Sequence, residues 1–168
     1  MAKNGPYGKP VIAVTILNSQ VQNLPITGKG TSGVENLTYL ELPFSPLRDL
    51  EVFQSLIGFE RLAVIIDENV FKGIPEIKSF LDQGLTDRGA DHYFLFTEST
   101  ASATLDKLET CDAVYLFPSD NLSDAEYQKL IDDVNDRGLK SFSILGRQDV
   151  DLGVLGGVAP ASNIELIA

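Results

Sequence analysis

Short apolar strands alternate with amphipathic helices along most of this chain, and that alternation limits the possible folds more than any other feature. The segment Leu62–Ile66 is uninterrupted by polar residues and ends at Asp67. Such a run predicts a strand that is buried on both faces. In the stretch that follows, Ile74, Ile77 and Leu81 recur at spacings of three and four residues, which predicts a helix with one apolar side.

The same pattern is repeated towards the C-terminus. Thr100 is placed to cap one further helix and Ser123 to cap another, with Glu126 completing a capping box. Strands that alternate with helices predict parallel pairing, so we expect an α/β, flavodoxin-like three-layer lobe with a mainly parallel sheet. Further strands are expected at His92–Phe96, Ala113–Phe117, Phe142–Leu145 and Leu152–Val158, and core positions at Val64, Ile66, Val114, Leu116, Phe142 and Ile144.

The N-terminal part of the chain follows a different pattern. Val11–Leu17 predicts a strand, the polar and glycine-rich segment 18–33 has no helical pattern, and Leu37–Leu42 predicts another strand. Ser45 is then placed to cap a helix that has Pro46 at its first position. A strand, a long loop and a new α/β unit are typical of a crossover between two lobes.

Three glycines in this loop, Gly28, Gly30 and Gly33, match the spacing of a dinucleotide-binding motif. That motif must follow a strand directly and open a helix. Here a polar segment separates it from the strand that ends at Leu17, and Val34–Leu42 has the pattern of a loop and a strand. We therefore predict a glycine-rich turn and no cofactor.

The charge of the chain argues against several classes of partner. Its 168 residues carry a net charge of −11. Binding to nucleic acid or to an anionic membrane surface depends on Lys and Arg, so we expect neither partner. The sequence has no apolar run of about 18 residues, so we expect no direct membrane insertion. The segment Met1–Pro10 lacks the apolar core of a signal peptide.

Residues that often carry catalysis are scarce. His92 is the only histidine and begins a predicted strand, at the edge of the sheet where ligands do not bind. Cys111 is the only cysteine and precedes a predicted strand, which favours a structural role. We therefore expect no catalytic residue, no metal site and no enzyme activity.

The candidate ligand-binding residues follow the predicted strands, because ligands of open parallel sheets bind beyond the carboxyl ends of the strands. The corresponding segments are 67–69, 97–99, 118–121 and 146–149. Polar side chains there can hold a small ligand. The candidates are Asp67, Glu68, Asn69, Thr97, Ser119, Asp120 and Asn121.

Two alternatives remain open for these residues. Asp67, Glu68 and Asp120 have the residue types of a phospho-acceptor site that binds Mg²⁺, although the lysine expected after its fifth strand is missing. Alternatively, segment 118–121 is turn chemistry alone, since Pro, Ser, Asp and Asn all favour turns.

Three segments of the chain match a known family in order and spacing: LPITGKGTSGVENLTY, RLAVIIDEN and CDAVYLFPSDN. They resemble three parts of ABC-transporter substrate-binding proteins: the interlobe crossover, the strand that follows the first helix of the second lobe, and an Asp-Ala-[Ile/Val]-Tyr…Asp-Asn segment. These proteins have the periplasmic binding protein type I fold. In the family, the loops corresponding to 67–69 and to Asp120 and Asn121 face the ligand cleft.

The resemblance implies that the chain is a fragment of a two-lobe periplasmic binding protein. Residues 1–34 then hold the last strand of the first lobe and the crossover, and residues 35–168 form the second ligand-binding lobe, truncated at its C-terminus. The implied function is that of the extracytoplasmic solute-binding component of an ABC importer. Such a component binds a small polar ligand, for example an amino acid, and delivers it to a membrane permease. The implied location is periplasmic or extracellular. A ligand-sensing receptor domain and a flavodoxin-like enzyme or phospho-acceptor are the alternatives.

Overall fold

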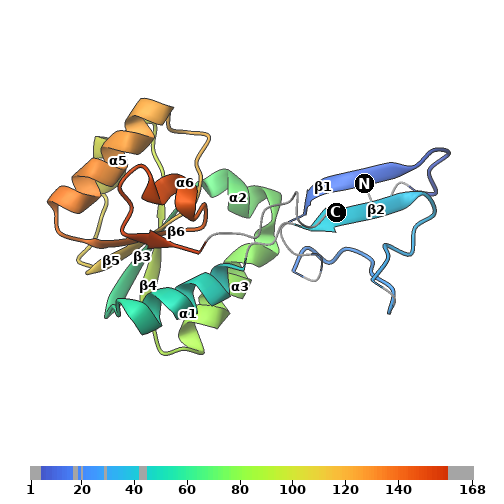
Figure 1. Cartoon of the computed structure of the whole chain (residues 1–168), viewed down its shortest axis with the longest axis horizontal. Helices are drawn as coiled ribbons and strands as arrows, with labels where there is room; N and C mark the ends of the chain where they lie inside the picture. The colour runs from blue at the N-terminus through green and yellow to red at the C-terminus, as the bar shows by residue number, and fades with distance from the viewer. Residues whose placement is uncertain (1–4, 17–18, 20, 29, 42–44, 159–168) are drawn as a thin grey trace. The chain divides into compact units, whose positions relative to one another are not determined.

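The computed structural model describes residues 5–16, 19, 21–28, 30–41 and 45–158. It divides the chain into two compact units, Met1–Phe44 and Ser45–Ala168 (Figure 1). The division falls later than the predicted boundary at residues 34 and 35, because the strand at Leu37–Glu41 pairs within the first unit. The assignment of the two parts to lobes stays a prediction.

The first unit contains a two-stranded parallel sheet in which β1 (Val11–Ile16) pairs with β2 (Leu37–Glu41). The glycine-rich segment between them forms turns, with Gly30 and Gly33 at positive φ angles of 76° and 68°. The Thr27 and Thr31 hydroxyls are hydrogen-bonded across this turn at 2.8 Å. No helix occurs among the described residues between the two strands, so the predicted glycine-rich turn is confirmed.

The second unit is built on a five-stranded sheet in the order β4-β3-β5-β6-β7, and every neighbouring pair is parallel. This order and these helical crossovers make it a flavodoxin-like lobe, as predicted. Its strands are β3 (Arg61–Ile66), β4 (Asp91–Phe96), β5 (Ala113–Leu116), β6 (Lys140–Ser143) and β7 (Gly156–Gly157).

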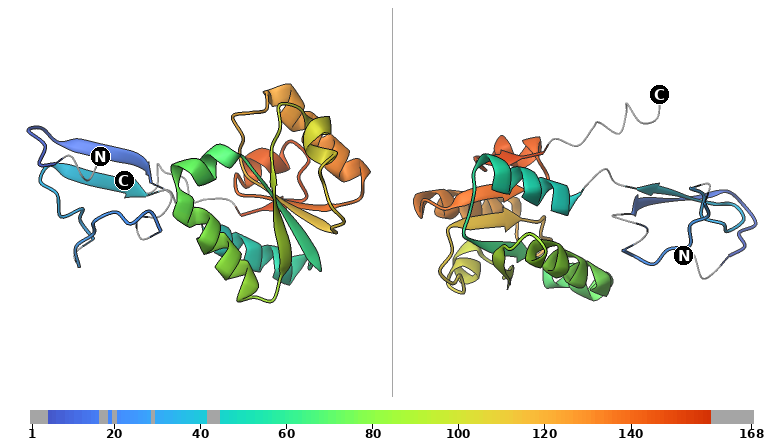
Figure 2. Two further views of the ribbon diagram at one scale, coloured as in Figure 1. Left: turned by 180° about the vertical axis from the view of Figure 1, so that it is seen from behind. Right: turned by 90° about the horizontal axis from the view of Figure 1, so that it is seen from below.

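Helices cover both faces of this sheet and make the expected three layers (Figure 2). On one face α4 and α5 pack against β3 and β5, and on the other α1 places Phe53 in a stacked contact with Phe142 of β6. The helices are α1 (Pro46–Leu56), α2 (Glu68–Gly73), α3 (Pro75–Thr86), α4 (Ala101–Leu105), α5 (Asp124–Asp136) and α6 (Arg147–Val150).

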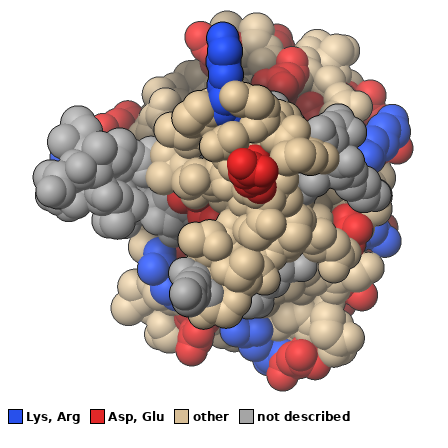
Figure 3. Space-filling view, turned by 90° about the vertical axis from the view of Figure 1, so that its right-hand side faces the viewer, with Lys and Arg blue, Asp and Glu red and all other residues tan. Residues whose placement is uncertain are grey.

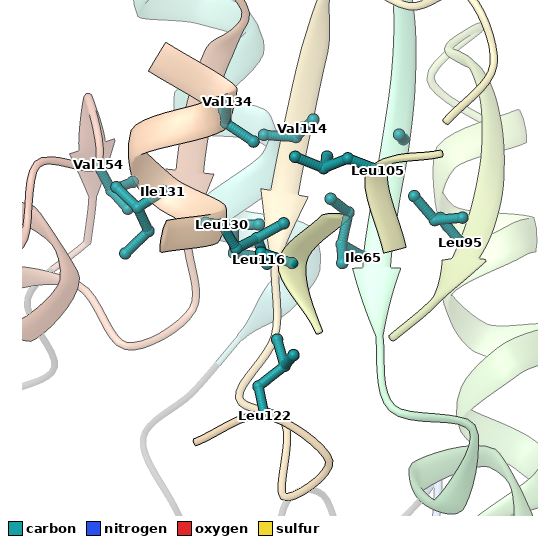
Figure 4. Packing of buried hydrophobic residues seen from close by; sticks show 12 residues of the cluster. Ile65, Leu95, Leu105, Val114, Leu116, Leu122, Leu130, Ile131, Val134 and Val154 are labelled. Carbon is teal, nitrogen blue, oxygen red and sulfur yellow. The ribbon is translucent and has the colours of Figure 1, made fainter. Parts of the chain in front are cut away.

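The core of the second unit lies between the sheet and its helices. In Figure 4, Leu130 and Val134 of α5 point towards Leu116 and Val114 of β5, because spacing by four residues places both leucine and valine on one side of the helix. All of the predicted core positions are buried: Val64, Ile66, Val114, Leu116, Phe142 and Ile144.

Two local predictions for the second unit were wrong. The strand expected at Phe142–Leu145 ends at Ser143, because the N–H groups of Leu145 and Gly146 turn back to bond Ser143. Only Gly156–Gly157 of the expected strand 152–158 pairs with the sheet, since a turn closed by the Val154 N–H and the Asp149 carbonyl precedes it. Ser45 does occupy the N-cap of α1, but its side chain makes no capping bond.

Candidate functional site

The candidate site lies beyond the carboxyl ends of β5 and β6. The chain leaves β5 through Pro118 and enters α5, where the Ser123 hydroxyl accepts a hydrogen bond from the Glu126 N–H at 3.3 Å. It leaves β6 through Gly146, whose φ of 61° allows the sharp turn into α6. Between these connections is a cavity of about 440 Å³, lined by Pro118, Ser119, Leu122, Asp124, Tyr127, Leu145, Gln148, Asp149 and Leu152.

The cavity is partly open to solvent, and its volume lies within the range of small-molecule sites. Pockets for small ligands measure about 300–1,000 Å³ and combine apolar walls with a few polar groups. Here proline and leucine side chains supply apolar surface, and Ser119, Tyr127 and Gln148 supply neutral polar groups. Two carboxylates, Asp124 and Asp149, also line the cavity, and none of the described lining residues is Lys, Arg or His.

A buried carboxylate organises one side of this cavity. Asp149 is only 1% exposed, and its Oδ2 atom accepts hydrogen bonds from the Tyr127 hydroxyl at 2.6 Å and from the Ser143 hydroxyl. Burial, the hydrogen bond and the charge of Asp149 raise the pKa of Tyr127 far above its ordinary value. The phenol therefore stays protonated and tethers α5 to α6 and to the end of β6.

Three of the predicted ligand-binding residues lie together beside this cavity. The Thr97 and Ser119 hydroxyls are 2.7 Å apart, and the Asn121 N–H donates to the Ser119 hydroxyl at 3.2 Å. The Asn121 side-chain amide also donates to the Thr97 carbonyl at 3.4 Å. These bonds join the segments that follow β4 and β5, but only Ser119 of the three lines the cavity.

The other predicted residues after β3 do not form the expected loop. Asp67 is the N-cap of α2 and its side chain accepts the Asn69 N–H at 2.8 Å, so Glu68 and Asn69 belong to the first turn of a helix. Glu68 forms an exposed ion pair with Lys72 at 2.6 Å. The expected loop at 67–69 was wrong because an aspartate that ends a strand can also cap the next helix. A ligand-binding role for the three stays a prediction.

Asp120 lies on the surface in the turn between β5 and α5. Within the described part of the chain its carboxylate takes part in no hydrogen bond or ion pair, and it does not line the cavity. Its predicted contact with a ligand stays a prediction.

The cavity includes residues that the sequence did not point to as candidates. Segment 146–149 was recognised as part of the binding edge, but Gln148 and Asp149 were not selected from it. Tyr127 was not selected either. The signal for Tyr127 was its hydroxyl, because a buried tyrosine usually needs a hydrogen-bond partner.

The remaining candidates for chemistry have structural surroundings. The His92 ring nitrogens lie 3.0 Å from the Ala90 carbonyl and 3.1 Å from Asp82. Cys111 is half-buried, and burial raises the pKa of its thiol. Among the residues that the structure describes, no three His, Cys, Asp or Glu side chains gather into a metal-binding group. The phospho-acceptor alternative for Asp67, Glu68 and Asp120 stays a hypothesis. None of the described helices has the length and apolar character needed to cross a bilayer.

Charged side chains are mixed in sign on the face of the molecule drawn in Figure 3. Blue Lys and Arg side chains and red Asp and Glu side chains are both visible there, and the blue ones are not gathered into one cluster.

The fold and the cavity together define the class: a flavodoxin-like α/β lobe with a cavity at the carboxyl ends of its parallel strands. No protein-family model matches the sequence, and a search of curated proteins found no significant match.

Solved structures resemble the chain in fold. A conserved domain protein from Vibrio cholerae superposes with a TM-score of 0.66 at 15% identity, over 89% of this chain and 50% of that one. An ABC domain from Streptococcus pneumoniae in complex with L-Trp superposes with a TM-score of 0.61 at 14% identity, over 90% of this chain and 52% of that one. The chain thus spans about half the length of these structures. At these identities the likeness shows the fold alone.

Proposed function

We propose that this chain is a ligand-binding lobe of a solute-binding protein that serves an ABC importer, and that it performs no chemistry of its own. The observation that carries the proposal is the cavity at the carboxyl ends of β5 and β6. In open α/β sheets this edge is where ligands bind. Its lining offers hydrogen-bonding groups and apolar surface.

The comparison with the L-Trp complex supports an amino acid as one class of ligand. A second lobe would enclose the ligand from the other side, since functional pockets cover most of a ligand's surface. The proposed location is periplasmic or extracellular, and the proposed partner is a membrane permease. Cell fractionation of the native organism tests the location: recovery of the protein in the cytosol contradicts it.

Ligand binding is tested directly by nuclear magnetic resonance on the ¹⁵N-labelled chain. A panel of amino acids, sugars, amines and carboxylates is titrated, and backbone amide shifts are mapped onto the structure. We expect at least one class to shift the amides of Leu122, Leu145 and Gln148, with dissociation constants of about 1 mM for a partly enclosed ligand. If no class shifts these amides, the cavity is not a ligand site.

A variant that fills the cavity without adding charge tests whether the shifts come from ligand bound in the cavity, and a matched variant outside the cavity is its control. Ser119→Leu places an apolar side chain in the cavity wall, and we expect it to abolish the shifts. Ser102→Leu, an exposed position on α4 outside the cavity, should leave them unchanged. Binding that persists in Ser119→Leu would assign the site elsewhere.

A further inference from the structure

Only one of the two oxygens of the Asp149 carboxylate accepts hydrogen bonds from the described residues. Both of its hydrogen-bond donors, the hydroxyls of Tyr127 and Ser143, reach the same atom, Oδ2. Within the described part of the chain, no hydrogen bond reaches Oδ1. Asp149 is 1% exposed and lines the cavity, and its Oδ1 atom is not sealed inside the protein, unlike the buried and unpartnered Oδ1 atom of Asp49. The site therefore lacks one hydrogen-bond donor that a ligand can supply.

The charge of the cavity selects the kind of donor. Asp124 lines the same cavity, and no cationic side chain is present among the described residues that line it. The positive end of α5 lies at this edge, but Asp124 and Glu126 in its first turn and the Ser123 cap already offset it. A ligand carboxylate or phosphate would thus meet two carboxylates here, whereas an ammonium group would be attracted to both.

The rest of the lining fits an apolar group next to that charge. Leu122, Leu145 and Leu152 contribute aliphatic side chains, and Pro118 adds a fourth apolar surface. We infer that the ligand presents an ammonium group to Oδ1 of Asp149 and an apolar side chain to these residues. This inference rests on the proposed function and names the ligand class: a small organic amine, including the amine end of an amino acid.

The test compares probes that share a ring system and differ in charge. The ring is indole, because one structural neighbour is a complex with L-Trp. Tryptamine carries an ammonium group, indole-3-propionate a carboxylate, and indole-3-propanol neither. We expect tryptamine to shift the amides of Leu145, Gln148 and Leu152 in the labelled chain, and indole-3-propionate to bind at least about tenfold more weakly, as expected for loss of one charge-assisted hydrogen bond.

Variants then assign the difference to Asp149. Asp149→Asn keeps an oxygen for Tyr127 and Ser143 and removes the charge, so it should weaken tryptamine about tenfold or more and leave indole-3-propanol nearly unchanged. Asp151→Asn is the control, because Asp151 is an exposed acid beside α6 that pairs with Arg147 and does not line the cavity. If Asp149→Asn does not fold, the probe series on the unmodified chain decides. Asp124→Asn, which changes an exposed side chain, then gives a smaller loss of about twofold to threefold for tryptamine.

The possible outcomes separate the two proposals. Equal or tighter binding of indole-3-propionate overturns the amine assignment and leaves the cavity as a ligand site. Binding of sugars or carboxylates alone from the wider panel has the same meaning. If neither these probes nor the panel shift the cavity amides, both proposals fail. Tryptamine binding that Asp149→Asn and Asp124→Asn leave unaltered also overturns the amine assignment.

Discussion

Replacing Asp112 should weaken the second unit, because this one carboxylate ties together the amino ends of three strands. Its Oδ1 atom accepts the backbone N–H groups of Arg61 at 2.8 Å and Glu60 at 3.0 Å, at the start of β3. Its Oδ2 atom accepts the Lys140 ammonium at 3.1 Å, at the start of β6. Asp112 itself directly precedes β5.

The magnitude follows from these contacts. A hydrogen bond to a charged group contributes about 1.5–3 kcal/mol when buried, but the Asp112 side chain is 36% exposed and water can replace part of each bond. We therefore expect Asp112→Ala to lower the free energy of unfolding by about 2 kcal/mol. Asp112→Asn retains the oxygen that meets Arg61 and Glu60 and loses only the ion pair with Lys140, so its loss should be about 0.5–1 kcal/mol.

The effect depends on pH in a definite direction. Burial acts to raise the pKa of Asp112, but hydrogen bonds from the Arg61 N–H, the Lys140 ammonium and the Glu60 N–H outweigh it and hold the pKa below its ordinary value. A depressed pKa stabilises the folded state above the unfolded pKa of about 3.9, and that stabilisation is lost as the pH falls through the folded value. The difference in free energy of unfolding between the native chain and Asp112→Asn should therefore be largest near neutral pH and should shrink below about pH 4.

The measurement is urea unfolding followed by far-ultraviolet circular dichroism, since the chain has no tryptophan. Asp136→Ala is the control: this exposed acid at the end of α5 has no side-chain hydrogen bond within the described residues, so its effect should stay within about 0.5 kcal/mol. Equal losses for Asp112→Asn and Asp112→Ala, or a difference that persists unchanged below about pH 4, would refute the reasoning.

Other positions give sharp expectations for the free energy of unfolding. Asp49 is 2% exposed and burial raises its pKa, so ionisation of Asp49 opposes folding once the pH rises above the pKa of the unfolded chain. Asp49→Asn should therefore stabilise the chain by about 1 kcal/mol near neutral pH and by nothing near pH 4. Urea titrations that give the same difference at both pH values would contradict this. A Cβ on Gly84 would lie 2.3 Å from Leu47 Cδ2, so Gly84→Ala should cost about 1–3 kcal/mol despite its better helix propensity. Adding Leu47→Ala should then cost less than it does in the native background, and strict additivity would rule out the clash. Glu126 accepts the Ala101 N–H at 2.7 Å, so Glu126→Ala should lower stability by about 1 kcal/mol, with Glu126→Gln recovering at least half of that loss in thermal unfolding.

Only one of the two hydrogen bonds of the capping box predicted at Ser123 forms in the structure. The Ser123 hydroxyl accepts the Glu126 N–H as the sequence indicates. The Glu126 carboxylate, however, bonds the Ala101 N–H at the start of α4, a residue far away in the chain. A local motif predicts where a helix begins, but a neighbouring helix competes for the same side chain.

The resemblance to a known family had a similar limit. It singled out Asp112, Asp120 and Asn121 within one segment. The structure places Asp112 at the amino ends of the strands, where it holds backbone N–H groups, and places Asn121 at the opposite, carboxyl edge. Residues matched by one motif thus have different surroundings, because a strand carries its two ends to opposite edges of the sheet.

The sequence by itself determined the α/β class, the parallel sheet and most of its buried positions. Strands β3, β4 and β5 and helices α3 and α5 all lie where periodicity predicted them. The physical reason is local: burial on both faces requires a continuous apolar run, and burial on one side of a helix requires spacing by three and four residues.

Only the tertiary structure decided which polar side chains meet. Tyr127 and Asp149 are separated by 22 residues and lie on different helices, yet they share the hydrogen bond that shapes the cavity. Ser143, which completes the network, belongs to a strand whose end was misplaced by its apolar pattern. Periodicity reports whether a side chain is buried, whereas its partner depends on how distant elements pack across the edge of the sheet.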